Sequence, residues 1–139
     1  MSSYLRLVYN TTVFNGVNKA ENLERIVNTL KSRCEKEIDC FNCMGWAESL
    51  KNLEPNNLHN WLLDNWNIAI GFNRNNDYIF NFVGEVYNSE FVKILLETLA
   101  PYLEDGLIVI VNVDYEYTLN YKVVNGELLE GWLYGKVFW

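Results

Sequence analysis

The sequence predicts an α+β fold, in which a mostly antiparallel sheet of about six or seven strands is covered on one face by about three helices. Apolar and polar side chains alternate over residues 107–120, which is typical of antiparallel strands that face water on one side. Asn125-Gly126 is a strong two-residue hairpin signal. Apolar residues recur at helical spacing in 23–34, 58–66 and 92–99. The length of 139 residues predicts one domain, residues 1–139, with its own core.

The first strand and the first long helix are predicted from local sequence. Residues 4–9, YLRLVY, are rich in aromatic and β-favouring side chains and predict a strand. Asn18 and Glu21 have the spacing of a capping box, which predicts the start of a helix. That helix is expected to bury a stripe of residues three or four apart: Leu23, Ile26, Val27, Leu30 and Cys34.

A short helix and a hairpin are expected in the middle of the chain. The helix begins at about Asn57, and its apolar stripe comprises Leu58, Trp61, Leu62 and Trp66. Residues 68–72 and 78–82 each alternate between apolar and smaller or polar side chains. The loop at 74–77 is therefore expected to join them into a β-hairpin.

The last third of the chain is expected to form one more helix and then sheet. Ser89 is the predicted cap of the helix, Pro101 ends or kinks it, and its stripe is Val92, Leu95, Leu96 and Leu99. The alternation assigns Leu107, Val109, Val111, Val113, Tyr115, Tyr117 and Leu119 to one face of the sheet. It assigns Asn112, Asp114, Glu116, Thr118 and Asn120 to the polar face. Asn125-Gly126 then joins 117–124 to 127–137.

The net charge of −7 is concentrated in the second half of the chain. Residues 1–66 hold seven basic and eight acidic side chains, whereas residues 67–139 hold four basic and ten acidic ones. Phosphate binding needs clustered Lys and Arg, so direct nucleic-acid binding is not expected. No apolar run approaches the roughly 20 residues of a membrane helix, and the N-terminal residues do not resemble a signal peptide. The odd number of cysteines, three, favours a reducing, cytoplasmic location.

Three cysteines and the single histidine are the residues that could form a metal or redox centre. Cys34, Cys40, Cys43 and His59 match the number of ligands that zinc needs. Cys34, however, continues an apolar helical stripe, and an extended 38–46 segment would turn Cys40 and Cys43 to opposite faces. His59 lies outside the stripe of its helix and is expected to face solvent. We therefore expect Cys34 and Cys40 to be core residues, and we predict no metal, no cofactor and no catalytic residue.

Acidic and aromatic side chains are interleaved in the C-terminal part of the sheet, which indicates a binding surface. The residues expected to contact a partner are Asp114, Glu116, Glu127, Glu130, Trp132 and Tyr134. Tyr and Trp are enriched at interface hot spots, and carboxylates favour a partner with a basic surface.

In its size, its acidity and its lack of cofactor motifs, the chain resembles toxin-immunity proteins and phage anti-defence inhibitors, including anti-CRISPR proteins. This resemblance in composition implies a non-enzymatic inhibitor that masks a basic, nucleic-acid-handling partner protein. Two alternatives are open. One is a small enzyme, or a zinc or redox protein, that uses Cys34, Cys40, Cys43 and His59. The other is a structural protein that forms homo-oligomers through its C-terminal strand.

Overall fold

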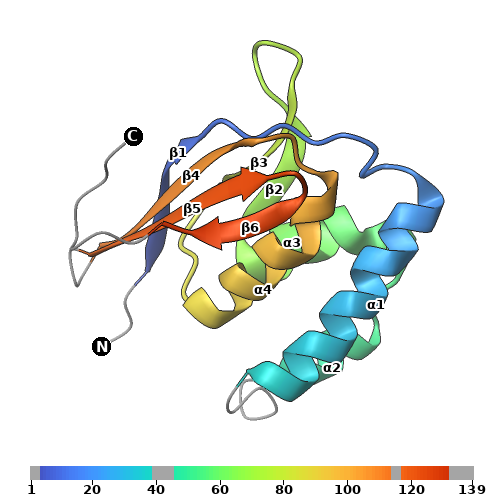
Figure 1. Cartoon of the computed structure of the whole chain (residues 1–139). Helices are drawn as coiled ribbons and strands as arrows, with labels where there is room; N and C mark the ends of the chain where they lie inside the picture. Colours follow the sequence, from blue (N-terminus) through green and yellow to red (C-terminus); the bar gives the residue numbers. More distant parts are fainter. Residues whose placement is uncertain (1–3, 39–45, 114–116, 132–139) are drawn as a thin grey trace.

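The computed structural model describes residues 4–38, 46–113 and 117–131, with Trp46 described by its backbone alone. Figure 1 shows the α+β architecture that the sequence predicts. The helices are α1 (Ala20–Glu37), α2 (Trp46–Lys51), α3 (Leu58–Trp66) and α4 (Ser89–Leu99), with short 3-10 helices at Pro55–Asn57 (η2) and Ala100–Tyr102 (η3). The strands are β1 (Leu5–Asn10), β2 (Ile68–Phe72), β3 (Tyr78–Phe82), β4 (Gly106–Asn112), β5 (Tyr117–Val124) and β6 (Glu127–Glu130). Helix α2 is an element that the sequence did not predict.

All strand pairs in the described chain are antiparallel, but the six strands form two sheets. Four strands pair in the order β1-β4-β5-β6, and β2 and β3 form a separate hairpin. Residues of β1 and β3 nevertheless lie side by side. The Leu5 N–H donates to the Val86 carbonyl at 2.6 Å, and the Asn10 amide donates to the Phe80 carbonyl at 3.2 Å. The register of β1 against β4 shifts in the middle of β1, and such a bulge increases the twist of a strand.

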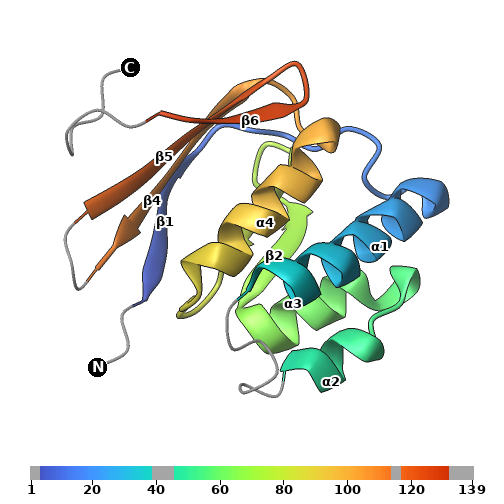
Figure 2. The same ribbon diagram turned by 60° about the horizontal axis from the view of Figure 1, so that its bottom comes forward.

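Helix α4 lies between the four-stranded sheet and helix α1, as Figure 2 shows. Its buried side chains are distributed around most of the helix and comprise Phe91, Val92, Ile94, Leu95, Leu96, Thr98 and Leu99. Burial on so many sides is expected of a helix that is covered by other elements on two sides. Within the described ranges, no helix combines the length and the apolar character that crossing a membrane requires.

The predicted stripes of α1 and α3 are confirmed as core. In α1, four of the five predicted residues are buried and Leu23 is half-buried; the buried ones are Ile26, Val27, Leu30 and Cys34. In α3, all four are buried: Leu58, Trp61, Leu62 and Trp66. The Trp66 ring stacks on the Phe91 ring of α4, with centroids 3.6 Å apart and planes 6° apart. This contact joins α3 to α4 through two large apolar side chains.

Both predicted helix caps were wrong. Lys19 occupies the N-cap position of α1 and makes no side-chain cap bond, because its ammonium group has no acceptor atom. The Asn18 side-chain oxygen accepts a hydrogen bond from the Tyr78 hydroxyl instead. At α4 the cap is Asn88, whose side-chain oxygen accepts from the Phe91 N–H at 2.9 Å. Ser89 is the first residue of that helix. Asn and Ser are both favourable N-cap residues, so the sequence alone does not show which of two adjacent candidates is the cap. The backbone conformation decides it.

The predicted faces of the 107–120 segment were also wrong. Ile108 and Ile110 are fully buried and belong to the core, although the alternation placed their neighbours there. Every residue from Leu107 to Val111 is apolar, so alternation cannot choose the core face of this strand. Asn112 and Asn120, assigned to one polar face, are each only 4% exposed, and the register places them on opposite faces. Because β4 and β5 are antiparallel neighbours, with Asn112 paired to Tyr117, the alternation does not run on from one strand into the other.

Both predicted hairpin turns are confirmed; the predicted 127–137 strand is described as β6 over Glu127–Glu130, and its residues 132–137 lie outside the described residues. Strands β2 and β3 pair in register around the loop at 74–77, in which Asn76 has a φ of 65°. Asn125 and Gly126 have φ values of 50° and 79°, as a type I′ turn between β5 and β6 requires. The Asn125 N–H also donates to Asp105 Oδ1 at 2.8 Å, which ties this turn to the start of β4.

We predict that Gly126→Val lowers the free energy of unfolding by about 2 kcal/mol, because a Cβ is strained at positive φ. The added Cβ would also lie 3.4 Å from Pro101 Cα. Gly71→Val is the matched control, since a Cβ at Gly71 meets no atom within 4 Å and Val suits a strand. Urea unfolding of both variants measures the difference. Equal stability of the two variants would contradict this account of the turn.

Candidate functional site

Of the six predicted contact residues, the structure describes two, Glu127 and Glu130, and both are exposed. The other four lie outside the described residues: Asp114, Glu116, Trp132 and Tyr134. Glu127 pairs with Val124 and Glu130 pairs with Tyr121 across the β5–β6 ladder. An odd separation of three residues along a strand places the two carboxylates on opposite faces. The structure therefore does not bring Glu127 and Glu130 together.

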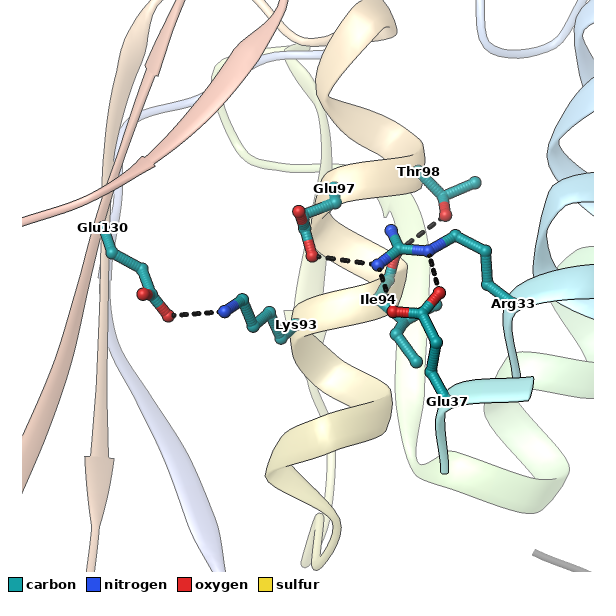
Figure 3. A network of polar contacts seen from close by, with 7 residues as sticks. All are labelled: Arg33, Glu37, Lys93, Ile94, Glu97, Thr98 and Glu130. Carbon is teal, nitrogen blue, oxygen red and sulfur yellow. Dashed lines mark hydrogen bonds and ion pairs between the residues drawn. The ribbon is translucent and has the colours of Figure 1, made fainter. Parts of the chain in front are cut away.

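Glu130 takes part in a polar network that joins β6, α4 and α1, shown in Figure 3. Lys93 Nζ of α4 lies 3.2 Å from Glu130 Oε1. On the other side of α4, Arg33 of α1 binds Glu37 at 2.6 Å and Glu97 at 3.3 Å. The hydrogen bond to Glu37 is the main reason why the pKa of Arg33 is raised above its ordinary value. Glu130 thus has an internal counter-ion, which reduces its contribution to an acidic surface.

A second group of acidic and aromatic residues lies at one end of the sheet. A row of paired residues crosses four segments there: Val86, Leu5, Asn112 and Tyr117. Tyr117 ends this row and shares the face of Val86, whereas Tyr87 is the residue after Val86 and alternates to the opposite face, so the two tyrosines lie at opposite sides of the row and on different faces. Tyr87 is 47% exposed and Tyr117 39% exposed. Three strand spacings separate the two sides, about 15 Å.

Two exposed carboxylates lie within three residues of Tyr87 in the sequence. Glu85 accepts a hydrogen bond from the Tyr87 hydroxyl, and Glu90 lies in the first turn of α4. Lys93, one turn further along α4, is paired with Glu130. Arg6 follows Leu5 on β1 and alternates to the same face as Glu85 and Tyr87, which flank Val86, so an exposed cation lies on the face of these two residues. We call the group Glu85, Tyr87, Glu90 and Tyr117 the acidic end.

The acidic end is also where β4 ends and β5 begins. Asn112 is the last residue of β4 and pairs with Tyr117, the first residue of β5. The sequence places Asp114 and Glu116 in the connection between these two strands. Glu127 pairs with Val124, seven residues along β5 from Tyr117, so it lies about 24 Å away. Sequence reasoning missed Glu85, Tyr87 and Glu90, because a long-range contact, the Leu5–Val86 bridge, brings their segment to the sheet.

The cysteine hypothesis is tested at Cys34. This residue is fully buried in α1, as predicted, and burial raises the pKa of its thiol to about 12. A thiol with so high a pKa is neither a nucleophile nor a ready metal ligand at neutral pH. Cys40 and Cys43 lie outside the described residues. Among the residues that are described, no three His, Cys, Asp or Glu side chains are grouped to hold a metal ion.

His59 does not face solvent as predicted. It is half-buried, and its Nε2 lies 2.6 Å from the hydroxyl of Tyr78 on β3. The Tyr78 hydroxyl donates to Asn18 Oδ1 at 3.0 Å, so His59 is left to donate its Nε2–H to Tyr78. Burial lowers the pKa of His59 and raises the pKa of Tyr78, so both groups are neutral at pH 7. No local sequence signal joins these residues, which lie 19 and 60 positions apart.

No model of a known protein family, no curated protein and no solved structure matches this chain. The function is therefore argued from the residues and geometry above, without support from a relative.

We predict that Cys34 is inert in the folded protein. In a Cys40→Ser/Cys43→Ser variant, Ellman's reagent should titrate no thiol under native conditions and one thiol in denaturant, because Cys34 is fully buried with a raised pKa. The same assay on the wild-type chain shows what the other two cysteines add. Rapid native reaction of Cys34 would restore the enzyme and redox alternative.

We predict that His59 makes stability depend on pH. Its pKa in the folded protein is lower than the ordinary value of about 6.5, so the unfolded chain binds the proton more readily. The free energy of unfolding should therefore be highest above about pH 7, and it should decrease as the pH drops through the pKa that His59 has in the folded protein. Urea unfolding between about pH 5 and 8 measures this change. His59→Gln keeps a hydrogen-bond donor for Tyr78 but does not titrate, so it should make the free energy of unfolding depend less on pH. An unchanged pH dependence in this variant would contradict the role given to His59.

Proposed function

We propose that this protein is a non-enzymatic binding protein, whose acidic surface binds and masks a basic partner protein. The observation that carries the proposal is the acidic end, where Glu85, Tyr87 and Glu90 are all exposed within one segment of six residues. Tyrosine supplies a large contact area with little loss of side-chain entropy, and it is a frequent hot-spot residue. Carboxylates beside such anchors select a partner of opposite charge and accelerate encounter.

The charge of the whole chain supports the same partner class. A net charge of −7 disfavours direct binding to nucleic acid and favours proteins with a basic surface. Proteins that handle nucleic acids carry such surfaces, because they must neutralise phosphates. We therefore propose an inhibitor or immunity type of function in the cytoplasm, comparable in style to toxin-immunity and phage anti-defence proteins. Asp114, Glu116, Glu127, Trp132 and Tyr134 stay predicted contacts within this proposal, whereas Glu130 contributes less because Lys93 neutralises it.

The burial of Cys34 disfavours the enzyme and redox alternative, because it removes one of the four groups on which that alternative relies. His59, a second member of the four, is hydrogen-bonded to Tyr78 on the β2–β3 hairpin. The homo-oligomer alternative stays open, and sizing of the pure protein tests it directly.

The proposal predicts a partner whose association rate depends on the acidic end. The partner is first identified by capture on the immobilised chain and mass spectrometry, and its binding kinetics are then measured with purified proteins. Glu85→Lys/Glu90→Lys should slow association by about ten-fold at low salt, and the difference should shrink as salt rises. Glu24→Lys/Glu35→Lys on α1 is the matched control, because it changes the net charge equally at exposed positions elsewhere.

The contact residues are tested by dissociation. Tyr87→Ala should speed dissociation with little effect on association, since truncation of an interface anchor acts mainly on the off-rate. A partner that binds the charge-reversed, control and Tyr87 variants equally would overturn the proposed surface. Turnover of a small molecule by the pure chain would overturn the proposed function.

A further inference from the structure

A hollow beside the β2–β3 hairpin, on the side where α1 begins, has the composition of a small-molecule site. Its volume is about 370 Å³, and its lining residues are Phe14, Gly16, Val17, Asn18, Lys19, Phe72 and Tyr78. This volume lies in the lower part of the range of ligand pockets, which are typically lined by aromatic side chains and a few polar groups. We call it the aromatic hollow.

Three aromatic rings form its apolar wall. The Phe14 and Tyr78 rings are tilted, with centroids 5.8 Å apart. The Phe72 and Tyr78 rings are in T-shaped contact, with centroids 4.8 Å apart, while Phe72 itself is 71% exposed. Most of the Phe72 ring therefore meets solvent. A planar ligand could remove that apolar surface from water by stacking on it.

Two hydrogen bonds hold Tyr78 in place. The Tyr78 hydroxyl is bound by His59 Nε2 at 2.6 Å and by Asn18 Oδ1 at 3.0 Å. These bonds come from α3 and from the segment before α1, so they fix Tyr78 from two sides. A preformed wall lowers the entropic cost of binding, because less must be ordered when the ligand arrives.

The rim supplies hydrogen-bond donors. The side-chain oxygen of Asn18 accepts the hydrogen bond from Tyr78, so its amide N–H groups can donate to other acceptors. Lys19 is exposed and adds an ammonium group, and among the described residues its ammonium forms no ion pair. Gly16, with a φ of 77°, turns the backbone at this rim and adds no side chain. Two donors beside an aromatic wall suit a ring that carries an anionic acceptor.

We propose that the aromatic hollow binds a small planar aromatic compound that carries a carboxylate or phosphate group. The ring lies against Phe72 and Tyr78, and the anionic group lies at Lys19 and Asn18. This site is independent of the acidic end. Tyr78 begins β3, whereas Glu85 and Tyr87 follow the end of that strand.

The probes are two anionic compounds and their neutral analogues: indole-3-acetate with indole-3-acetamide, and adenosine monophosphate with adenosine. Each is titrated into the intact, ¹⁵N-labelled chain and followed by amide chemical shifts. We expect saturable shifts at Gly16–Lys19, Phe72 and Tyr78 with at least one anionic probe, bound about ten-fold more tightly than its analogue. The carboxylate and phosphate arms show which anion the rim prefers.

Two variants test the assigned roles. Phe72→Ala should weaken binding of the anionic probe about ten-fold, and the exposure of Phe72 makes this variant tolerable to the fold. Lys19→Gln should remove the preference for the anionic probe while the neutral analogue still binds. Val83→Ala, another exposed apolar position, is the control and should change nothing.

Three results would overturn the proposal: no saturable shift with either anionic probe up to about 10 mM, equal affinity for charged and neutral probes, or full binding by Phe72→Ala. None of these results affects the test of the acidic end, which measures a protein partner with different variants.

Discussion

Strand β4 is the element on which the rest of the structure depends. It pairs with β1 on one side and with β5 on the other, so it joins the start of the chain to its end. Ile108 and Ile110 of this strand are fully buried against the helical layer. Placing β1 beside β4 closes a loop that spans most of the chain. The entropic cost of closing this loop is offset by the burial of apolar side chains on both strands. Leu5, only 1% exposed, is the residue of β1 where this burial is greatest.

The position of β1 also determines both candidate surfaces. Leu5 bridges to Val86, which places Glu85 and Tyr87 beside the start of β1, at the same end of the sheet as the end of β4 and the start of β5. Further along, the Phe14 N–H donates to the Tyr78 carbonyl at 2.7 Å, which brings the segment before α1 to the aromatic hollow. The two surfaces therefore lie at opposite ends of the same β1–β3 contact. One is acidic and suits a protein, and the other is aromatic with cationic and amide donors.

Several residues have roles that their local sequence does not indicate. Asn18 has the spacing of a helix cap but binds Tyr78, which is 60 positions away. His59 lies outside the apolar stripe of its helix but is covered by the β2–β3 hairpin. Glu130 belongs to an acidic segment, yet Lys93 of α4 lies 3.2 Å from its carboxylate. In each case a residue from a distant element forms a hydrogen bond or an ion pair with the side chain. The local sequence pattern had assigned that side chain to a helix cap or to solvent.

The sequence by itself determined the helical stripes, the two hairpins and the burial of Cys34, because periodicity and turn chemistry act over a few residues. It also determined the acidic charge of the second half of the chain. Only the tertiary structure decided that the six described strands divide into two sheets, that Ile108 and Ile110 face the core, and that Glu130 pairs with Lys93 of α4. The physical reason is that a strand apolar at every position carries no signal of its covered face. Its face is chosen by pairing with β1 and β5, and those contacts are long-range.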